Sequence, residues 1–309
     1  MSDPTHKRLG FDIGGTKVAA IVLQDDSTEP LLHLKESTPP NYDDLLKLLK
    51  SIFDKVTSEF GEVTVGVCHP GSTIPRNGQI HNSNLRYFNG HTFRSDIQAL
   101  LHCPVQTAND ANCFALSEAM AGVAKDVGVV FGATLGSGLG GGLVFNKTIQ
   151  HGLNGVGAEW GHISLPWQND SEFALKLPCY CGLENCQESF LSGKGLAQDY
   201  ERAVGKALKG EDIVTLAENG DHEANICLER YEHRLARACA MVINIIDPDM
   251  IVLGGGLSSL QRLYVNVPKL WDPYIFSNEP VSTPLKQAKF GGDSGCRGAA
   301  YLGSMKNEK

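Results

Sequence analysis

Two similar segments limit most strongly what this chain can fold into. Residues 9–23 and residues 127–146 each contain an apolar run, a glycine turn with a hydroxyl side chain, and a second apolar run. Apolar runs separated by glycines form strands around a tight turn, so each segment predicts a β-hairpin. Recurrence of one pattern at two places in 309 residues indicates two lobes built on one plan.

The glycines of the second hairpin also match a dinucleotide-binding motif. Gly136, Gly138 and Gly141 satisfy the pattern G-x-G-x-x-G. That motif has to follow a strand and open a helix, whereas a strand-like apolar run, residues 143–146, follows the glycines here. We therefore expect a hairpin at this position.

A third glycine turn, residues 254–256, follows the apolar run 250–253 and precedes residues with helical composition. Glycine turns expose backbone N–H groups that can cradle phosphate oxygens. The first turn taken alone is explained equally well as an ordinary hairpin turn, but the three together predict a nucleoside triphosphate site. The candidate ATP-binding residues are Asp12, Gly14, Gly15, Thr16, Lys17, Thr134, Gly136, Ser137, Gly138, Gly255 and Gly256.

A dense group of soft ligands lies between the second and third turns. Cys179, Cys181 and Cys186 fall within eight residues, and His162 lies upstream. A Cys₃His set matches the tetrahedral shell that structural Zn²⁺ prefers. The alternative is that some of these cysteines are small buried apolar residues. The other six of the nine cysteines are scattered among apolar neighbours, which favours reduced thiols over disulfides.

One carboxylate stands at the start of a predicted helix. The short strand 105–108 leads into Asn109 and Asp110, and residues 111–119 have helical composition. Asp110 alone could also be a helix cap, worth about 1 kcal/mol. Other expected elements are an amphipathic helix at 43–60, a strand at 63–68, helices at 192–204, 211–218 and 221–246, and a closing helix at 295–302.

Composition excludes some classes of partner. The net charge of −8 opposes a nucleic-acid or anionic-membrane surface, which needs a basic field. No apolar run approaches the roughly 18 residues of a membrane-spanning helix. We expect a cytoplasmic protein with neither partner.

Five motifs, in their order along the chain, resemble those of the repressor/open-reading-frame/kinase (ROK) family of bacterial sugar kinases. They are residues 12–17 (DIGGTK), 109–110 (ND), 134–138 (TLGSG), 159–162 (EWGH) and 179–188 (CYCGLENCQE). The resemblance implies an α/β, two-lobed, actin-like (ribonuclease-H-like) fold with an interlobe cleft. Residues 1–116 would form the small lobe, closed by a carboxyl-terminal helix within 291–309. Residues 117–290 would form the large lobe with a zinc knuckle.

The resemblance also implies ATP-dependent phosphorylation of a hexose hydroxyl, usually that on C6, with Asp110 as the catalytic base. Phosphoryl transfer needs a carboxylate that accepts the substrate proton, and an aspartate is ionised at neutral pH. Mg²⁺ would accompany ATP, with Asp12 as an outer-shell partner, and a homodimer is typical. The implied sugar-binding residues are Gly71, Asn84, Asn109, Asp110, Glu159, His162 and Glu188; the implied zinc ligands are His162, Cys179, Cys181 and Cys186.

Within the family, residues 70–72 (PGS) and 159–167 (EWGHISLPW) resemble most the fructokinase or mannofructokinase subgroup. D-Fructose is therefore the expected substrate and D-mannose the second; N-acetylglucosamine is the alternative. His69 and Asn185 depart from the usual aliphatic residue and glycine. A sugar-responsive repressor is a remote alternative, because such members carry a helix-turn-helix domain and only eleven residues precede Asp12.

Overall fold

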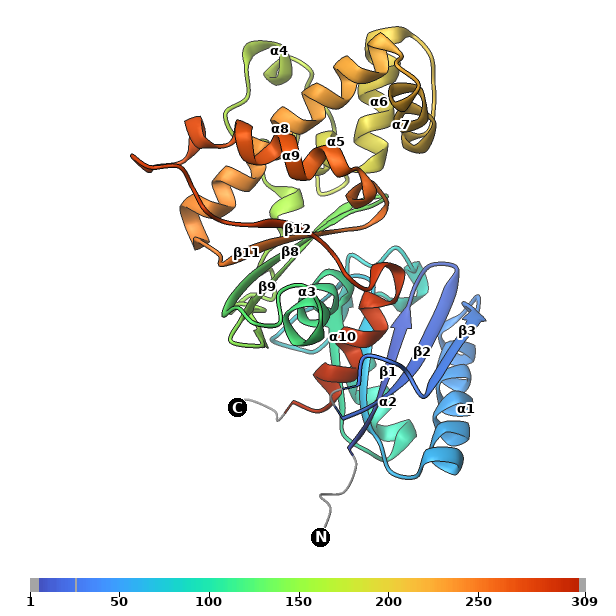
Figure 1. The fold of residues 1–309 in the computed structure, drawn as a ribbon. Helices are drawn as coiled ribbons and strands as arrows, with labels where there is room; N and C mark the ends of the chain where they lie inside the picture. The colour runs from blue at the N-terminus through green and yellow to red at the C-terminus, as the bar shows by residue number, and fades with distance from the viewer. Residues whose placement is uncertain (1–5, 26, 306–309) are drawn as a thin grey trace. The chain divides into compact units, whose positions relative to one another are not determined.

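The computed structural model describes residues 6–25 and 27–305, which form two compact units (Figure 1). Unit 1 takes its residues from 1–126, 142–157 and 290–309, and unit 2 consists of 127–141 and 158–289. The boundary expected after residue 116 would fall inside α3 (Asp110–Ala121), which the structure keeps whole in unit 1. Residues 306–309 of the expected closing segment lie outside the described residues.

Unit 1 is built on a five-stranded sheet in the order β3-β2-β1-β4-β7. Its strands are β1 (Lys7–Ile13), β2 (Lys17–Gln24), β3 (Leu32–Ser37), β4 (Thr64–His69) and β7 (Val105–Asn109). β1 pairs antiparallel with β2 and parallel with β4, which pairs parallel with β7. The first predicted hairpin is confirmed. A small sheet, β5 (Ser72–Thr73) with β6 (Ile80–His81), follows β4.

Successive residues of β1 face opposite sides of the sheet and pack against different helices. Leu9, Phe11 and Ile13 are buried in one cluster with α1 (Tyr42–Phe60) and α2 (Phe93–Leu101). The intervening Gly10 faces α10 (Ser294–Gly303), where an added Cβ would lie 2.0 Å from the Cys296 carbonyl oxygen. Successive residues of a strand point to opposite faces. β1 is therefore covered by α1 and α2 on one face and α10 on the other.

The predicted amphipathic helix is α1. Asn41 caps its amino terminus by accepting a hydrogen bond from the backbone N–H of Asp44, and Gly61, at φ 77°, ends it. Leu45, Leu49 and Val56 recur at helical spacing and are fully buried. This packing fixes α1 on the first sheet.

Unit 2 contributes to a second five-stranded sheet in the order β10-β9-β8-β11-β12. The strands are β8 (Val129–Leu135), β9 (Leu139–Phe145), β10 (Thr148–Ile149), β11 (Met250–Gly254) and β12 (Leu285–Gln287). The glycine turn expected over 136–142 is shorter than predicted, because β9 begins at Leu139. Gly141 lies inside the strand, where an added Cβ would come 2.3 Å from the Ala158 carbonyl oxygen.

The longest helix is α8 (His222–Ile246), which confirms the prediction over 221–246. The other helices of unit 2 are α4 (Asp170–Phe173), α5 (Glu188–Leu191), α6 (Gly193–Val204), α7 (Gly210–Glu218) and α9 (Gln261–Leu270). Short 3₁₀ helices are η1 (Arg86–Phe88), η2 (Trp160–His162), η3 (Gly256–Ser259), η4 (Asp272–Tyr274) and η5 (Gly291–Asp293).

A buried ion network joins three of these helices. Arg234 of α8 binds Glu172 of α4 and Asp199 of α6, each at 2.9 Å, and Arg237 binds Glu172 at 2.6 Å. Burial works to raise the pKa of Glu172, but the hydrogen bonds from Arg237 and Arg234 outweigh it and hold that pKa below its ordinary value. Paired, hydrogen-bonded charges of this kind are the form in which a buried charge is tolerated.

Across the described part of the chain, no helix combines the length and the apolar character needed to cross a bilayer.

Candidate active site

The carboxyl ends of three parallel strands bring together two aspartates of unit 1. Asp12 of β1 lies opposite Cys68 of β4, and His69 of β4 lies opposite Asn109 of β7. The chain then enters α3, whose first residue is Asp110. Ligand groups in sheets with parallel strands commonly lie at this edge, and the topology of unit 1 brings Asp12 and Asp110 to it together.

Asn109, and not Asp110, is the N-cap of α3. Its side-chain oxygen accepts a hydrogen bond from the backbone N–H of Asn112 at 2.9 Å. The Asp110 carboxylate accepts the backbone N–H of Ala111 at 2.8 Å. The capping role considered for Asp110 therefore belongs to Asn109, which already satisfies one of the unpaired donors of the helix start.

The Asp12 carboxylate has a raised pKa. Burial is the main cause that raises its pKa to about 6; a hydrogen bond with Cys68 opposes the shift, and the carboxylates of Asp110 and Asp293 add to it. An added Cβ on Gly295, in the first turn of α10, would lie 2.3 Å from Asp12 Oδ2. The sequence did not point to Asp293 or Gly295, although G-D-S-G over 292–295 is typical of a helix start.

The first glycine turn connects β1 and β2 beside Asp12. The backbone N–H of Gly14 donates to the Lys17 carbonyl at 2.9 Å, and the Thr38 hydroxyl donates to the Gly14 carbonyl at 2.7 Å. Gly15, Thr16 and Lys17 are exposed. Neither Gly14 nor Gly15 has a positive φ. The open space that an added Cβ on Gly15 would enter is the feature that suits a ligand's approach.

Gly71 and Asn84 lie on neighbouring segments of unit 1. Gly71 has φ 81°, and an added Cβ would lie 2.6 Å from the His81 carbonyl oxygen and 2.8 Å from the Ser83 backbone nitrogen. Asn84 follows Ser83 and is exposed. A side chain at position 71 is excluded on two grounds, φ and space, so glycine is required where these segments meet.

The second and third glycine turns meet in unit 2. β8 and β11 are parallel, with Thr134 opposite Gly254. Gly255 takes φ 81°, and an added Cβ would lie 2.6 Å from the Leu135 carbonyl oxygen. The Thr134 hydroxyl accepts the Gly140 backbone N–H at 3.1 Å. Ser137, Gly255 and Gly256 are exposed, so this edge presents backbone N–H groups and a hydroxyl, the donors that bind phosphate.

Glu188 connects the cysteine segment to the second glycine turn. It is the first residue of α5, and its carboxylate accepts the backbone N–H of Leu139 at 3.1 Å. An added Cβ on Gly138 would lie 2.9 Å from Glu188 Oε2. Glycine at 138 therefore makes room for the carboxylate, and Glu188 is held at the start of β9.

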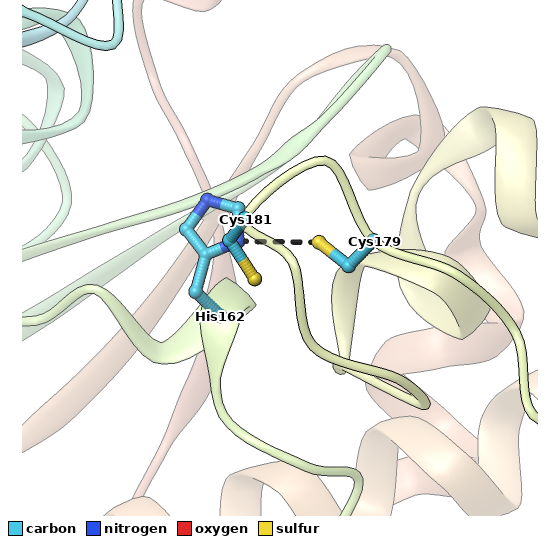
Figure 2. Close-up of side chains that lie close together, drawn as sticks. All are labelled: His162, Cys179 and Cys181. Atoms are coloured by element: carbon cyan, nitrogen blue, oxygen red, sulfur yellow. Dashed lines mark hydrogen bonds between the residues drawn. The ribbon is translucent and has the colours of Figure 1, made fainter.

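The predicted metal ligands converge in unit 2 (Figure 2). Ligand atoms of His162, Cys179 and Cys181 all lie within 4.8 Å of one another, with His162 Nδ1 3.5 Å from Cys179 Sγ. Cys186 joins them, its Sγ 3.6 Å from that of Cys181. Four soft donors at this spacing fit the composition of a structural zinc shell. Cys186 is buried and Cys181 exposed, so the group lies at the surface of the unit.

Tyr180, between two of these cysteines, lies on the other side of the His162 ring. Its hydroxyl is 2.8 Å from His162 Nε2, and the two rings meet edge to face at 4.9 Å. Burial raises the pKa of Tyr180, and the negative charges of Glu188 and Glu159 raise it further. Tyr180, to which the sequence assigned no role, thus contacts His162, one of the predicted sugar-binding residues, and the charges of two others, Glu159 and Glu188, act on its hydroxyl.

The structure explains why asparagine can stand at position 185, where glycine is usual in the family. Its φ of 55° lies in the left-handed region, which asparagine tolerates better than most residues. Its side-chain oxygen accepts the Leu177 backbone N–H at 2.8 Å, and its side-chain nitrogen donates to the Phe173 carbonyl at 3.1 Å. Asparagine therefore supports the turn before Cys186 and ties it to α4.

Comparison with known proteins identifies the group to which this arrangement belongs. The sequence pattern of the ROK family matches residues 8–306. The chain is a member of the ROK family. It has the two-sheet α/β fold of that family, which is an actin-like ATPase fold, and it is a sugar kinase, a phosphotransferase with an alcohol acceptor.

Relatives of this ROK protein are similar along their whole length. The N-acetyl-D-glucosamine kinase of Vibrio cholerae is 36% identical over 298 residues, which cover 95% of this chain and 98% of that protein. The ROK hexokinase structure from Thermus thermophilus has a TM-score of 0.83 at 27% identity and covers 96% and 97% of the two chains. A ROK glucokinase from Streptomyces griseus, solved with glucose and AMPPNP, has a TM-score of 0.76 at 25% identity, over 96% and 98%.

These comparisons confirm the family. Two relatives that are 36% identical to this chain are N-acetyl-D-glucosamine kinases, whereas the motifs suggested the fructokinase subgroup.

Proposed function

We propose that this ROK kinase transfers the γ-phosphoryl group of ATP to the C6 hydroxyl of a hexose, with N-acetyl-D-glucosamine as the first candidate. The observation that carries the proposal is the placement of Asp110 at the first turn of α3, beside Asp12 at the same sheet edge. A carboxylate at an edge that also holds a glycine turn is the arrangement that phosphoryl transfer to a hydroxyl needs.

In the proposed reaction Asp110 accepts the proton of the sugar hydroxyl. The hydroxyl oxygen forms a bond to the γ-phosphorus as the bond from that phosphorus to the β-phosphate oxygen breaks, and ADP leaves with the electron pair. In unit 1 the exposed turn at Gly15, and in unit 2 the exposed turns at Ser137 and Gly256, each present donors that suit phosphate oxygens.

Mg²⁺ bound with ATP supplies positive charge at the phosphates. The residues of unit 1 suit such a cation, since the carboxylates of Asp110 and Asp293 both raise the pKa of Asp12, and a nearby cation lowers the free energy of such a group of like charges. We assign Asp12 as its outer-shell partner.

We also propose that His162, Cys179, Cys181 and Cys186 hold a structural Zn²⁺. Support comes from the donor set and its closeness, with sulfurs of Cys181 and Cys186 3.6 Å apart. Bound zinc would fix the segment that carries His162 and Glu188.

A second candidate substrate, D-fructose with D-mannose, follows from a different observation. Residues 70–72 (PGS) and 159–167 (EWGHISLPW) resemble the fructokinase subgroup. The identity of 36% to N-acetyl-D-glucosamine kinases favours the N-acetyl sugar, because it extends over 95% of the chain.

A coupled assay of ADP release tests the proposal. It compares N-acetyl-D-glucosamine, N-acetyl-D-mannosamine, D-glucose, D-fructose and D-mannose, and the phosphorylated position is read by NMR. We expect the highest kcat/KM for N-acetyl-D-glucosamine. A preference of about tenfold or more for fructose, some 1.4 kcal/mol, would select the second candidate. If none of the five sugars causes ATP to be consumed, the proposed sugar-kinase function is contradicted.

We propose a homodimer as the assembly, which gel filtration with light scattering tests.

A further inference from the structure

The family resemblance implies that His162 both binds zinc and contacts the sugar. In the structure, however, the Tyr180 hydroxyl lies next to the ring nitrogen that faces away from the cysteines. The two nitrogens of His162 have different neighbours: Nδ1 lies 3.5 Å from Cys179 Sγ, and Nε2 lies 2.8 Å from the Tyr180 hydroxyl. When the lone pair of Nδ1 binds the metal ion that we propose for the cysteine group, the hydrogen of the neutral imidazole is on Nε2. His162 Nε2 then donates to the tyrosine oxygen and has no second hydrogen to offer a ligand.

This arrangement leaves the Tyr180 hydroxyl as a donor. A phenol accepts one hydrogen bond and donates another. Because the Tyr180 oxygen accepts a hydrogen bond from His162 Nε2, the O–H of Tyr180 points away from the imidazole. Tyr180 is 72% exposed, so a ligand in solution can reach this donor.

The surroundings of Tyr180 identify the class of ligand. Glu159 is the N-cap residue of η2, the 3₁₀ helix that carries His162, and Glu188 stands two residues after Cys186, where the Leu139 backbone N–H fixes it at 3.1 Å. An ionised carboxylate accepts hydrogen bonds and cannot donate them. A neutral ligand with several hydroxyl groups would donate to the carboxylates and accept from the phenol, which is the pattern of a sugar.

We propose that the Tyr180 hydroxyl, oriented by His162, contacts a sugar hydroxyl directly and is a specificity-determining group of the substrate site. His162 then acts through Tyr180 and through the cysteine group. This inference rests on the proposed sugar-kinase function, and it adds to that function a residue between the metal ligands Cys179 and Cys181.

Tyr180→Phe tests the proposal because it keeps the ring and removes only the hydroxyl. The ligand is the sugar among N-acetyl-D-glucosamine, D-fructose and D-mannose that the wild-type protein phosphorylates with the highest kcat/KM. We expect the calorimetric Kd and the KM for that sugar to rise about tenfold, the loss of one hydrogen bond. The kcat and the KM for ATP should stay within about twofold of the wild-type values. The zinc content and the thermal midpoint should be unchanged. Tyr274→Phe, in η4 of the same unit, is the matched control and should bind like the wild type.

Monodeoxy analogues of the same sugar separate contact from positioning. For the analogue that lacks the partner hydroxyl, the wild type and Tyr180→Phe should bind equally, while the others keep the tenfold difference. Equal binding of the parent sugar by both proteins, tighter binding by the variant, or the same penalty for every analogue would overturn the direct contact. A wild-type protein that phosphorylates no sugar would instead contradict the proposed function.

Discussion

His69 and Asn109 are partners in the parallel ladder between β4 and β7. His69 is fully buried, and its ring lies 5.7 Å from that of Phe88 and 6.0 Å from that of Phe93. Its Nε2 has no hydrogen-bond partner among the residues that the structure describes. The His69 imidazole therefore lies on the strand beside Asn109, the residue before Asp110. Its environment is apolar and would suit an aliphatic side chain.

We predict that His69→Leu removes an acid sensitivity of the protein. Burial lowers the pKa of His69 from 6.5 to about 4, the Pro70 carbonyl opposes the shift, and His151 adds to it. Above pH 6.5 the imidazole is neutral in both states. Between pH 6.5 and 4 the unfolded chain binds a proton that the folded protein does not, so stability falls by about 3 kcal/mol. Urea unfolding at pH 7 and pH 4.5 measures this, and equal pH dependence in both proteins would contradict it.

Asp12→Asn should stabilise the protein at pH 8 and impair catalysis. The pKa of Asp12 is raised from 3.8 to about 6. Below pH 3.8 the carboxyl is protonated in both states. Between pH 3.8 and 6 the folded protein keeps a proton that the unfolded chain has lost, so the cost of the charge grows over this range and is constant above it. The variant should gain about 2–3 kcal/mol of unfolding free energy at pH 8 and none at pH 3.5. Its kcat/KM should fall at least about tenfold. A less stable variant at pH 8 would refute this account.

Asp110→Asn should abolish turnover while sugar binding persists. The amide keeps the shape of the side chain but cannot accept the hydroxyl proton, so kcat should fall by about 10³-fold or more. Isothermal calorimetry of sugar binding and the coupled assay measure the two effects. Asp126→Asn, an exposed acid of unit 1, is the control. Near-wild-type turnover of Asp110→Asn would remove it from the role of base.

Cys181→Ser should lose the metal. Elemental analysis of the wild type is expected to give one zinc per chain, and the variant should contain little and melt at a lower temperature, because zinc binding contributes to folding. Cys103→Ser, a half-buried thiol of unit 1, should keep the zinc. A stable wild-type protein purified without any metal would sink the zinc assignment.

Glu172→Gln should destabilise the protein far more than removal of an exposed acid. The change leaves Arg234 and Arg237 buried without a carboxylate that both contact. We expect a loss of about 3–5 kcal/mol. Asp54→Asn breaks the exposed pair with Lys50 and should cost less than about 1 kcal/mol. Similar urea midpoints for the two variants would contradict the role of the network.

Local features of the fold could be predicted from the sequence, whereas distant contacts could not. Glycine turns and helical spacing predicted the β1–β2 hairpin, α1 and α8. The cap at Asn109 could not be separated from a cap at Asp110, because adjacent side chains compete for the same backbone donors. The contact of Asp12 with Gly295 depends on packing of α10 against β1, which leaves no local pattern.

The site shows the same division. The spacing of Cys179, Cys181 and Cys186 indicated that their sulfurs lie close together, as they do in the structure, because the three residues belong to one tight segment. The contact of Tyr180 depends on which nitrogen of His162 faces the sulfurs. The spacing of residues along the sequence cannot predict that orientation.

The close fit of α10 onto β1 and β4 has a consequence for biosynthesis. Gly66 leaves room for the Ala299 carbonyl, as an added Cβ would come within 1.8 Å of it. The strands that form this seat are made early, and the helix that fills it is translated after the whole of unit 2. The sheet face that α10 covers therefore stays exposed in the nascent chain until residues 294–303 emerge from the ribosome.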